Sequence, residues 1–179
     1  MNSSALDDYL PAYDFGHRHA IDVPAPPARV HEAVHHYSLD ESASTRLLFR
    51  LRGLPPAGPF LASLRGIGFE VLAEIPGRET IVGLAARLLA EGRFLLPLPP
   101  QGAAGFRDLD LPRTLKIAAS LGVRPRGGGT VLETETRVLC TDRAAWALFA
   151  PYWAIIRLPG GFIRRRMLTG IRRKAVQGT

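Results

Sequence analysis

The chain has 179 residues, 46% hydrophobic and 22% charged, a composition typical of a globular protein and not of a disordered one. Its single cysteine, Cys140, excludes an internal disulfide and a multi-cysteine metal site, and it favours a reducing compartment. Positions 1–156 hold 16 basic and 16 acidic residues, so the seven basic residues from Arg157 onward account for the whole net charge of +7. This balance argues against a nucleic-acid-binding surface over the whole body.

The N-terminus carries no targeting signal that can be recognised. Residues 1–15 lack the apolar run of a secretory signal, and no apolar stretch of the chain is long enough to cross a bilayer. We therefore expect a cytoplasmic protein. The length suits one domain over residues 1–179, with a flexible N-terminus over 1–12 and a basic helix end over 162–179.

The first part of the chain predicts one strand followed by two short helices. Residues 14–23 alternate with the period of a half-buried strand. Prolines then end this strand, and apolar residues at helical spacing predict helices over 27–38 and 43–52. The inward residues of the strand are Phe15, His17, His19, Ile21 and Val23, and those of the second helix are Leu47, Leu48 and Leu51.

The second part predicts an antiparallel meander covered by one long helix. Strands are expected over 67–75, 80–89, 114–123 and 130–140, with a further short one over 92–96 and a loop over 97–112. The glycines at 127–129 make a hairpin turn between the last two long strands. Thr141 or Asp142 caps a final helix that runs to about residue 175. Pro151 and Pro159 predict that this helix is bent or broken.

This α+β order resembles the START-like helix-grip superfamily, the SRPBCC-type ligand-binding domains that include polyketide cyclases, lipid-transfer domains and pollen-allergen-type binders. The resemblance is carried by the segment 23–30 (VPAPPARV) leading into the first helix, and by 133–138 (ETETRV) followed by Thr141-Asp142 and Tyr152-Trp153. It spans about residues 13–175. It implies a curved antiparallel sheet wrapped around the C-terminal helix, with a deep apolar cavity between them, and binding more often than catalysis.

Small residues in the middle of strands would leave room for a ligand in such a cavity. Pockets of this kind are mostly apolar, with a few placed polar groups. The alternative is that the same side chains pack against one another in a solid core, and the buried apolar area is the same in both cases. The residues predicted to line the cavity are Phe69, Val71, Ala73, Leu115, Ile117, Ala119, Leu132, Thr134, Thr136, Trp146, Phe149, Trp153 and Ile156.

Two histidines share the apolar face of the first strand. His17 and His19 could orient the carbonyl or hydroxyl of a ligand, or they could be ordinary histidines at the edge of the core. They are the candidates for catalysis if the protein is a cyclase or dehydratase. Arg18 should point to the opposite face and form a salt bridge, and Glu133 and Glu135 should face outward.

The segment His31-Glu32-Ala33-Val34-His35 matches the zinc-protease helix motif H-E-x-x-H, in which two histidines bind zinc and the glutamate is the general base. The third-ligand position of the extended motif holds Glu41. The helix is short and amphipathic, with Val30 and Val34 on its buried stripe, so the helix-grip layout already explains the segment. We expect no metal and no cofactor, and zinc chemistry is the least favoured alternative.

The end of the chain is a basic amphipathic segment. Its cations either cap a solvated helix end or contact anionic lipid headgroups, and the lack of interleaved aromatics disfavours nucleic acid. The cations in question are Arg164, Arg165, Arg166, Arg172, Arg173 and Lys174. The leading functional hypothesis is non-catalytic binding of a hydrophobic small molecule, lipid or polyketide-like. The first alternative is a cyclase or dehydratase acting on such a ligand.

Overall fold

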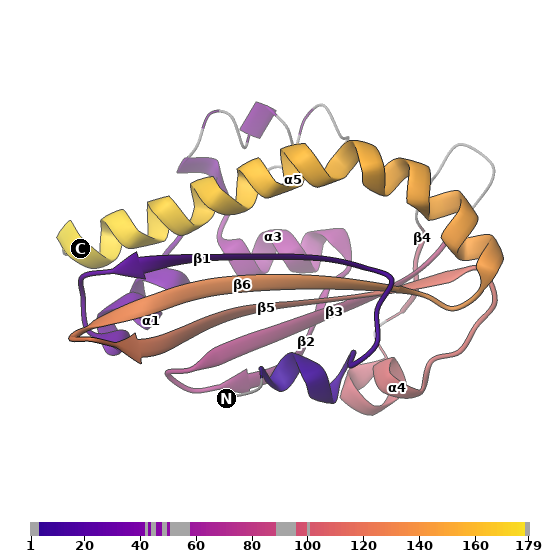
Figure 1. Cartoon of the computed structure of the whole chain (residues 1–179), viewed down its shortest axis with the longest axis horizontal. Coiled ribbons are helices and arrows are strands. Elements are labelled where there is room, and N and C mark those ends of the chain that lie inside the picture. The colour runs from indigo at the N-terminus through magenta and orange to yellow at the C-terminus, as the bar shows by residue number, and fades with distance from the viewer. Residues whose placement is uncertain are drawn as a thin grey trace.

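The computed structural model describes residues 4–41, 43, 46, 47, 50, 58–88, 96–99 and 101–177. The described strands form one antiparallel sheet in the order β1-β6-β5-β3-β2, with β4 paired to the C-terminal end of β3 (Figure 1). The strands are β1 (Phe15–Val23), β2 (Glu70–Ile75), β3 (Glu79–Arg87), β4 (Leu96–Pro97), β5 (Thr114–Arg126) and β6 (Gly129–Cys140). The helices are η1 (Ala5–Asp8), α1 (Pro27–His35), η2 (Leu39–Glu41), α3 (Phe60–Ile67), α4 (Gly102–Asp108) and α5 (Arg143–Gln177).

The predicted helix-grip architecture is confirmed. Helix α5 has 35 residues and runs along one face of the sheet, above β1 and β6 (Figure 1). It begins after Asp142, whose carboxylate accepts a hydrogen bond from the Ala145 amide at 2.6 Å. The helix is unbroken through Pro151 and Pro159, and Figure 1 shows it bending as it crosses the sheet. A bent helix was one of the two predicted outcomes.

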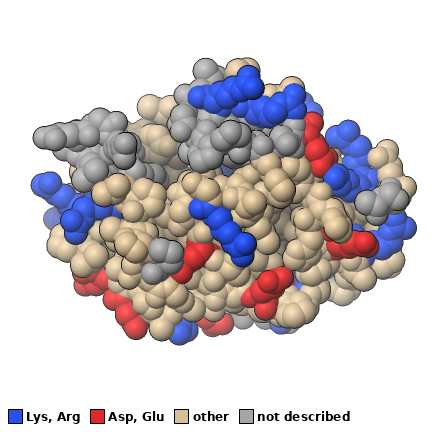
Figure 2. All heavy atoms as spheres, turned by 180° about the vertical axis from the view of Figure 1, so that it is seen from behind, with Lys and Arg blue, Asp and Glu red and all other residues tan. Residues whose placement is uncertain are grey.

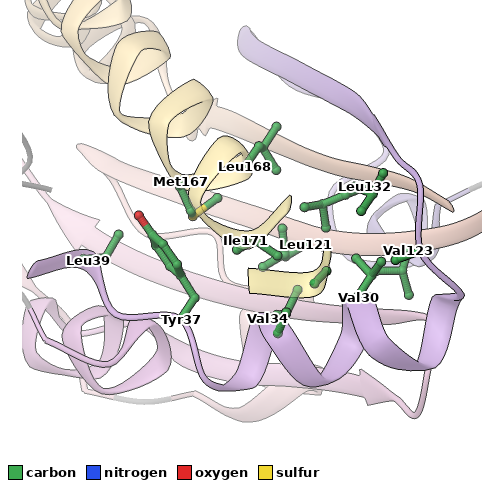
Figure 3. Packing of buried hydrophobic residues seen from close by; sticks show 14 residues of the cluster. Val30, Val34, Tyr37, Leu39, Leu121, Val123, Leu132, Met167, Leu168 and Ile171 are labelled. Carbon is green, nitrogen blue, oxygen red and sulfur yellow. The ribbon is translucent and has the colours of Figure 1, made fainter. Parts of the chain in front are cut away.

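One apolar cluster joins α1, the C-terminal turns of α5 and the ends of the strands that lie between these two helices. Figure 3 shows Met167 and Ile171 of α5 directed at Val34 and Tyr37 on one side and at the sheet on the other. Tyr37 is 2% exposed, and Gly170 lies directly against its ring. We call this the α1 cluster; its sheet members are Val23, Leu121, Val123 and Leu132.

A second cluster lies under the N-terminal turns of α5, at the other end of the same face. Phe149 is its centre, and aromatic rings surround it: the ring centroids of Phe15 and Trp153 lie 5.6 and 6.0 Å from that of Phe149. Such contacts add to the stabilisation that comes from apolar burial. We call this the Phe149 cluster; its sheet members are Leu115, Val138 and Cys140.

The opposite face of the sheet is covered by η1 and α4, which the sequence analysis did not predict. The loop expected over 97–112 contains α4, and Phe106 of this helix is fully buried against the sheet. Leu6 and Leu10 are also buried there, so this part of the N-terminal segment expected to be flexible packs on the sheet. Ser4 and the Ala5 amide bond the buried carboxylate of Glu79, at 2.5 and 3.1 Å, and fix η1 in place.

The remaining predicted elements differ mainly at their ends. Helix α3 was not predicted, and it displaces the start of the next strand from residue 67 to Glu70. The last two strands form the predicted hairpin but extend further into its turn. The helix over 43–52 and the strand over 92–96 fall largely outside the described residues; Leu47, predicted to be buried, is 57% exposed. No helix within the described ranges combines the length and apolarity needed to cross a membrane.

Candidate functional site

The middle of the α5-facing surface of the sheet is polar, between two apolar ends. Side chains directly opposite one another in an antiparallel pair lie on the same face, so the β1–β6 register groups them in pairs. The outer two pairs belong to the apolar clusters, and the inner two consist of histidine and threonine. In order along β1 the pairs are Phe15 with Val138, His17 with Thr136, His19 with Thr134, and Ile21 with Leu132.

Where helix α5 crosses this polar stretch, its residues are the smallest of the helix. Gly161 is buried, and a Cβ atom at this position would lie 3.5 Å from His19 Nε2. One turn further along, Arg164 reaches down to the sheet, where its Nη2 donates to Thr136 Oγ1 at 3.1 Å. We call this group the histidine site; its members are His17, His19, Thr134, Thr136, Gly161 and Arg164.

The two histidines carry buried nitrogen atoms with no partner within the described part of the chain. His17 Nε2 and His19 Nε2 are both shielded from solvent and make no hydrogen bond there. Their rings are stacked, with centroids 5.9 Å apart, and the Trp153 ring lies 5.2 Å from that of His17. Because an unsatisfied buried polar atom costs free energy, each of these nitrogens is a position where an added polar group would be favourable.

The surroundings favour the neutral form of both rings. Burial lowers the pKa of His17, and the charges of Arg164, Arg157 and Arg165 lower it further. The pKa of His19 is lowered by burial first and then by Arg164, Arg165 and His17. A neutral imidazole Nε2 donates or accepts a hydrogen bond according to its tautomer. The site can therefore bind a hydroxyl or a carbonyl, and the neighbouring arginines favour a group that carries negative charge.

The threonines on the sheet are already bonded. Thr134 Oγ1 donates to the Ser120 carbonyl oxygen at 2.8 Å, and Thr136 Oγ1 accepts from Arg164. Both side chains are buried. They form the floor of the histidine site, and the free bonding capacity lies with the two imidazole rings above β1.

The predicted lining residues are spread along the whole α5-facing surface. Leu115 and Phe149 are buried in the Phe149 cluster, and Ile117 and Trp153 pack against it. Leu132 belongs to the α1 cluster at the far end. Ala119 pairs with Thr136 and with Val82, and Val71 pairs with Val82, so these two residues are on the same face, towards the β2 side.

Four lining predictions need separate mention. The β-bulge between Val71 and Ala73 reverses the alternation of β2, and Ala73 consequently packs against the Leu72–Phe106 cluster on the η1 and α4 face, not under α5. Trp146 is 48% exposed and stacks on Phe15 with centroids 6.1 Å apart. Phe69, just before β2, and Ile156 of α5 are both half-buried.

The cavity itself stays a prediction. Two hollows are lined by described residues: one by Tyr13, Gly16, His17, Arg18, Glu135 and Arg137, mostly on the face away from α5, and one lies between α1 and Lys174. The first of these reaches His17 from the edge of the sheet.

The structure brings no third metal ligand to the H-E-x-x-H segment within the described residues. His31 and His35 lie on α1 with their Nε2 atoms 3.4 Å apart, but the Gly77 amide donates to His31 Nε2 at 3.3 Å. The nearest carboxylate oxygen to His35 is Glu74 Oε1 at 3.9 Å, an ion-pair distance and not a coordination distance. Within the described residues no three or more His, Cys, Asp or Glu side chains are grouped to hold a metal ion.

The other candidate groups are structural. Arg18 and Arg124 both bond Glu133, at 2.7 Å, on the face away from α5, as predicted for Arg18 and for the strand acids. Cys140 is buried, and burial together with Asp14 raises the pKa of its thiol to about 12. A thiol with this pKa is not a nucleophile at neutral pH.

Two members of the histidine site were missed by sequence reasoning. Arg164 was assigned to the basic tail, and Gly161 was not identified as a site residue. A signal did exist for Arg164: it follows Trp153 by 11 residues, which is three helical turns and hence the same face of α5.

No protein-family model matches the chain, and no curated protein does. Among solved structures, the chain is similar to the crystal structure of Ara h 8.0201 (12% identity, 92% of this chain and 99% of that chain, TM-score 0.38). It is also similar to truncated norcoclaurine synthase from Thalictrum flavum (13% identity, 92% and 95%, TM-score 0.39). A third structure is TTHA0849 from Thermus thermophilus (14% identity, 90% and 97%, TM-score 0.30). These values are too low to bear on function.

Proposed function

We propose that the protein binds an apolar small molecule, lipid-like or polyketide-like, between the sheet and α5, with an oxygen-bearing end of the molecule at His17 and His19. The observation that carries this proposal is the pair of buried Nε2 atoms, without a partner among the described residues, that lie between the two apolar ends of the α5-facing surface. A protein that used this face only as a core would have no need for two unsatisfied imidazoles there, because leucine would pack without that cost.

The neighbours of the histidines also suit a ligand with an apolar part and a polar end. The Phe149 cluster on one side and the α1 cluster on the other offer apolar contacts to its hydrocarbon part. Arg164 offers positive charge to its polar end, and Gly161, where a Cβ atom would lie 3.5 Å from His19 Nε2, brings the α5 backbone close to this ring. This arrangement of apolar walls with a few placed polar groups is typical of small-molecule sites.

A fluorescent fatty acid, 11-(dansylamino)undecanoic acid, tests the proposal by titration. We expect saturable one-to-one binding accompanied by quenching of Trp153 emission. Gly161→Leu should weaken binding at least tenfold, because the added side chain occupies the space over His19. Thr169→Leu adds the same side chain at an exposed position of α5 and should leave the affinity unchanged. Absence of saturable binding, or equal effects of the two variants, would refute the proposal.

The second candidate is a cyclase or dehydratase acting on a ligand of the same class. It is favoured by one observation: both imidazoles have a buried Nε2 without a partner among the described residues, in surroundings that lower their pKa and favour the neutral form that acts as a general base. His17→Ala and His19→Ala separate the two functions. In a binding protein each loses about one hydrogen bond, and the affinity falls about fivefold. In an enzyme the same changes abolish turnover of a polyketide substrate while the variants still bind the dansyl probe.

A further inference from the structure

The outward side of α5 carries large apolar side chains that the fold does not cover. Ile155 is 73% exposed and Leu158 is 70% exposed, while Leu148 and Phe162 are 42% and 39% exposed. Their spacings of seven, three and four residues place all four on one side of the helix, opposite the side that contributes Phe149 and Trp153. We call these four residues the outer stripe.

The same helix is strongly and exclusively basic. Of the 23 Lys and Arg residues in the chain, α5 holds eight, and it holds none of the 16 Asp and Glu residues. Arg165 and Arg166 are exposed along the outer stripe, and the Arg166 guanidinium lies 5.2 Å from the centroid of the Phe162 ring. The outer stripe is therefore an apolar band bordered by cations.

The structure divides the six cations that the sequence analysis assigned to membrane contact. Arg164 bonds Thr136 inside the histidine site, and Lys174 bonds Glu41 at 2.7 Å and the His36 carbonyl oxygen at 3.0 Å. Arg165, Arg166, Arg172 and Arg173 are exposed. Figure 2, seen from behind, shows Lys and Arg along the top and at both ends of the molecule, whereas most of the acidic side chains on that face lie on the lower half, away from α5.

We propose that the outer stripe is a docking surface for an anionic lipid bilayer, on which α5 lies parallel to the membrane plane. The charge of the helix decides the occupant. A second copy that presented the same helix would bring its exposed arginines against the same arginines, which is repulsive. Nucleic acid would satisfy the arginines but offers no apolar volume to Ile155 and Leu158. The interface of an anionic bilayer supplies both headgroup charge and hydrocarbon.

Vesicle co-sedimentation of the full chain tests this proposal at low salt. We expect binding to vesicles of phosphatidylcholine with phosphatidylserine, and little binding to phosphatidylcholine alone. Each exposed arginine at an anionic surface is worth about fivefold in affinity. Arg165→Gln/Arg166→Gln/Arg173→Gln should therefore weaken binding about a hundredfold. The control Arg65→Gln/Arg78→Gln/Arg87→Gln removes the same charge from other exposed positions and should have a much smaller effect.

Ile155→Ser/Leu158→Ser tests the apolar part and should also release the protein from the vesicles, without lowering its melting temperature, because both side chains are exposed. Three results would overturn the proposal. The first is no co-sedimentation with the phosphatidylserine vesicles. The second is an equal loss of binding in the two triple arginine variants. The third is a dimer in solution, or a complex with duplex DNA, that depends on the outer stripe while vesicle binding is absent.

Discussion

Gly170→Ala is the substitution whose effect follows most directly from the packing of α5. Alanine in place of glycine stabilises a helix interior by about 1 kcal/mol. At Gly170, however, the new Cβ atom would lie 2.5 Å from Tyr37 Cε2 and 3.1 Å from Tyr37 Cζ. The Tyr37 ring is 2% exposed and enclosed by the α1 cluster, so it cannot move aside without repacking. Overpacking of this kind costs about 1–3 kcal/mol.

Gly161→Ala is the matched control, because it makes the same change in the same helix. Its Cβ atom would meet nothing closer than His19 Nε2 at 3.5 Å, an ordinary contact. The propensity gain is common to both variants, so Gly170→Ala should be about 1–3 kcal/mol less stable than Gly161→Ala. Urea denaturation at constant temperature measures both values.

A double-mutant cycle locates the cause of the difference. In a Tyr37→Leu background the ring is gone, and Gly170→Ala should then stabilise by about 1 kcal/mol, as in the control. Equal stability of Gly170→Ala and Gly161→Ala in the wild-type background would refute the close packing of α5 on Tyr37. A destabilisation that persists in the Tyr37→Leu background would refute the assignment of its cause.

Further expectations concern pH, ion pairing and zinc. Because the pKa values of His17 and His19 are lowered by folding, the unfolded chain takes up protons before the folded chain does, and stability should fall between about pH 7.5 and about pH 5.5. His17→Asn/His19→Asn should lose less stability over this interval in urea titrations; an unchanged pH dependence would contradict the assignment. Arg137→Met should destabilise by about 3 kcal/mol, because it leaves the enclosed Glu135 carboxylate without its partner at 2.6 Å. Arg126→Met removes an exposed pair and should cost less than about 1 kcal/mol; thermal melting of both arginine variants measures the two costs. Chelator dialysis should leave the melting temperature unchanged, whereas stoichiometric zinc lost together with stability would restore a metal role for His31.

Those parts of the fold that depend on local pattern were predictable from the sequence. The alternation of Phe15, His17 and His19 identified β1 and its α5-facing side, and the proline start with Val30 and Val34 identified α1. These elements bury one face each, so their hydrophobic period is direct information about their environment. The long final helix was predictable for the same reason, despite its two internal prolines.

The parts that were missed depend on tertiary contacts. Helix α4 has seven residues rich in glycine and alanine, and it is held by Phe106, whose burial needs the underside of the sheet. The bulge that moves Ala73 to the other face has no local sequence signal, since the alternation of β2 reads smoothly through it. Helix α3 was overlooked even though its C-terminal Gly68, with a φ of 108°, is a typical helix stop.

The candidate site was predictable in part. His17 and His19 were identified as the polar members of an apolar face, but their unpartnered state depends on what α5 places above them. Arg164 and Gly161 reach the site only because the curved helix brings its middle turns over β1 and β6. The outer stripe was hidden by the same helix, because a 35-residue segment with apolar residues on two sides does not reveal from its sequence which side faces the sheet.

Native mass spectrometry of the wild-type protein and of Gly161→Leu, each incubated with 11-(dansylamino)undecanoic acid, tests the central claim most directly. We predict a single adduct on the wild-type protein and on Thr169→Leu, and a predominantly unliganded Gly161→Leu. Wild-type protein that stays unliganded, or an adduct of equal intensity on Gly161→Leu, would contradict the claim that a ligand binds between α5 and the sheet at His17 and His19.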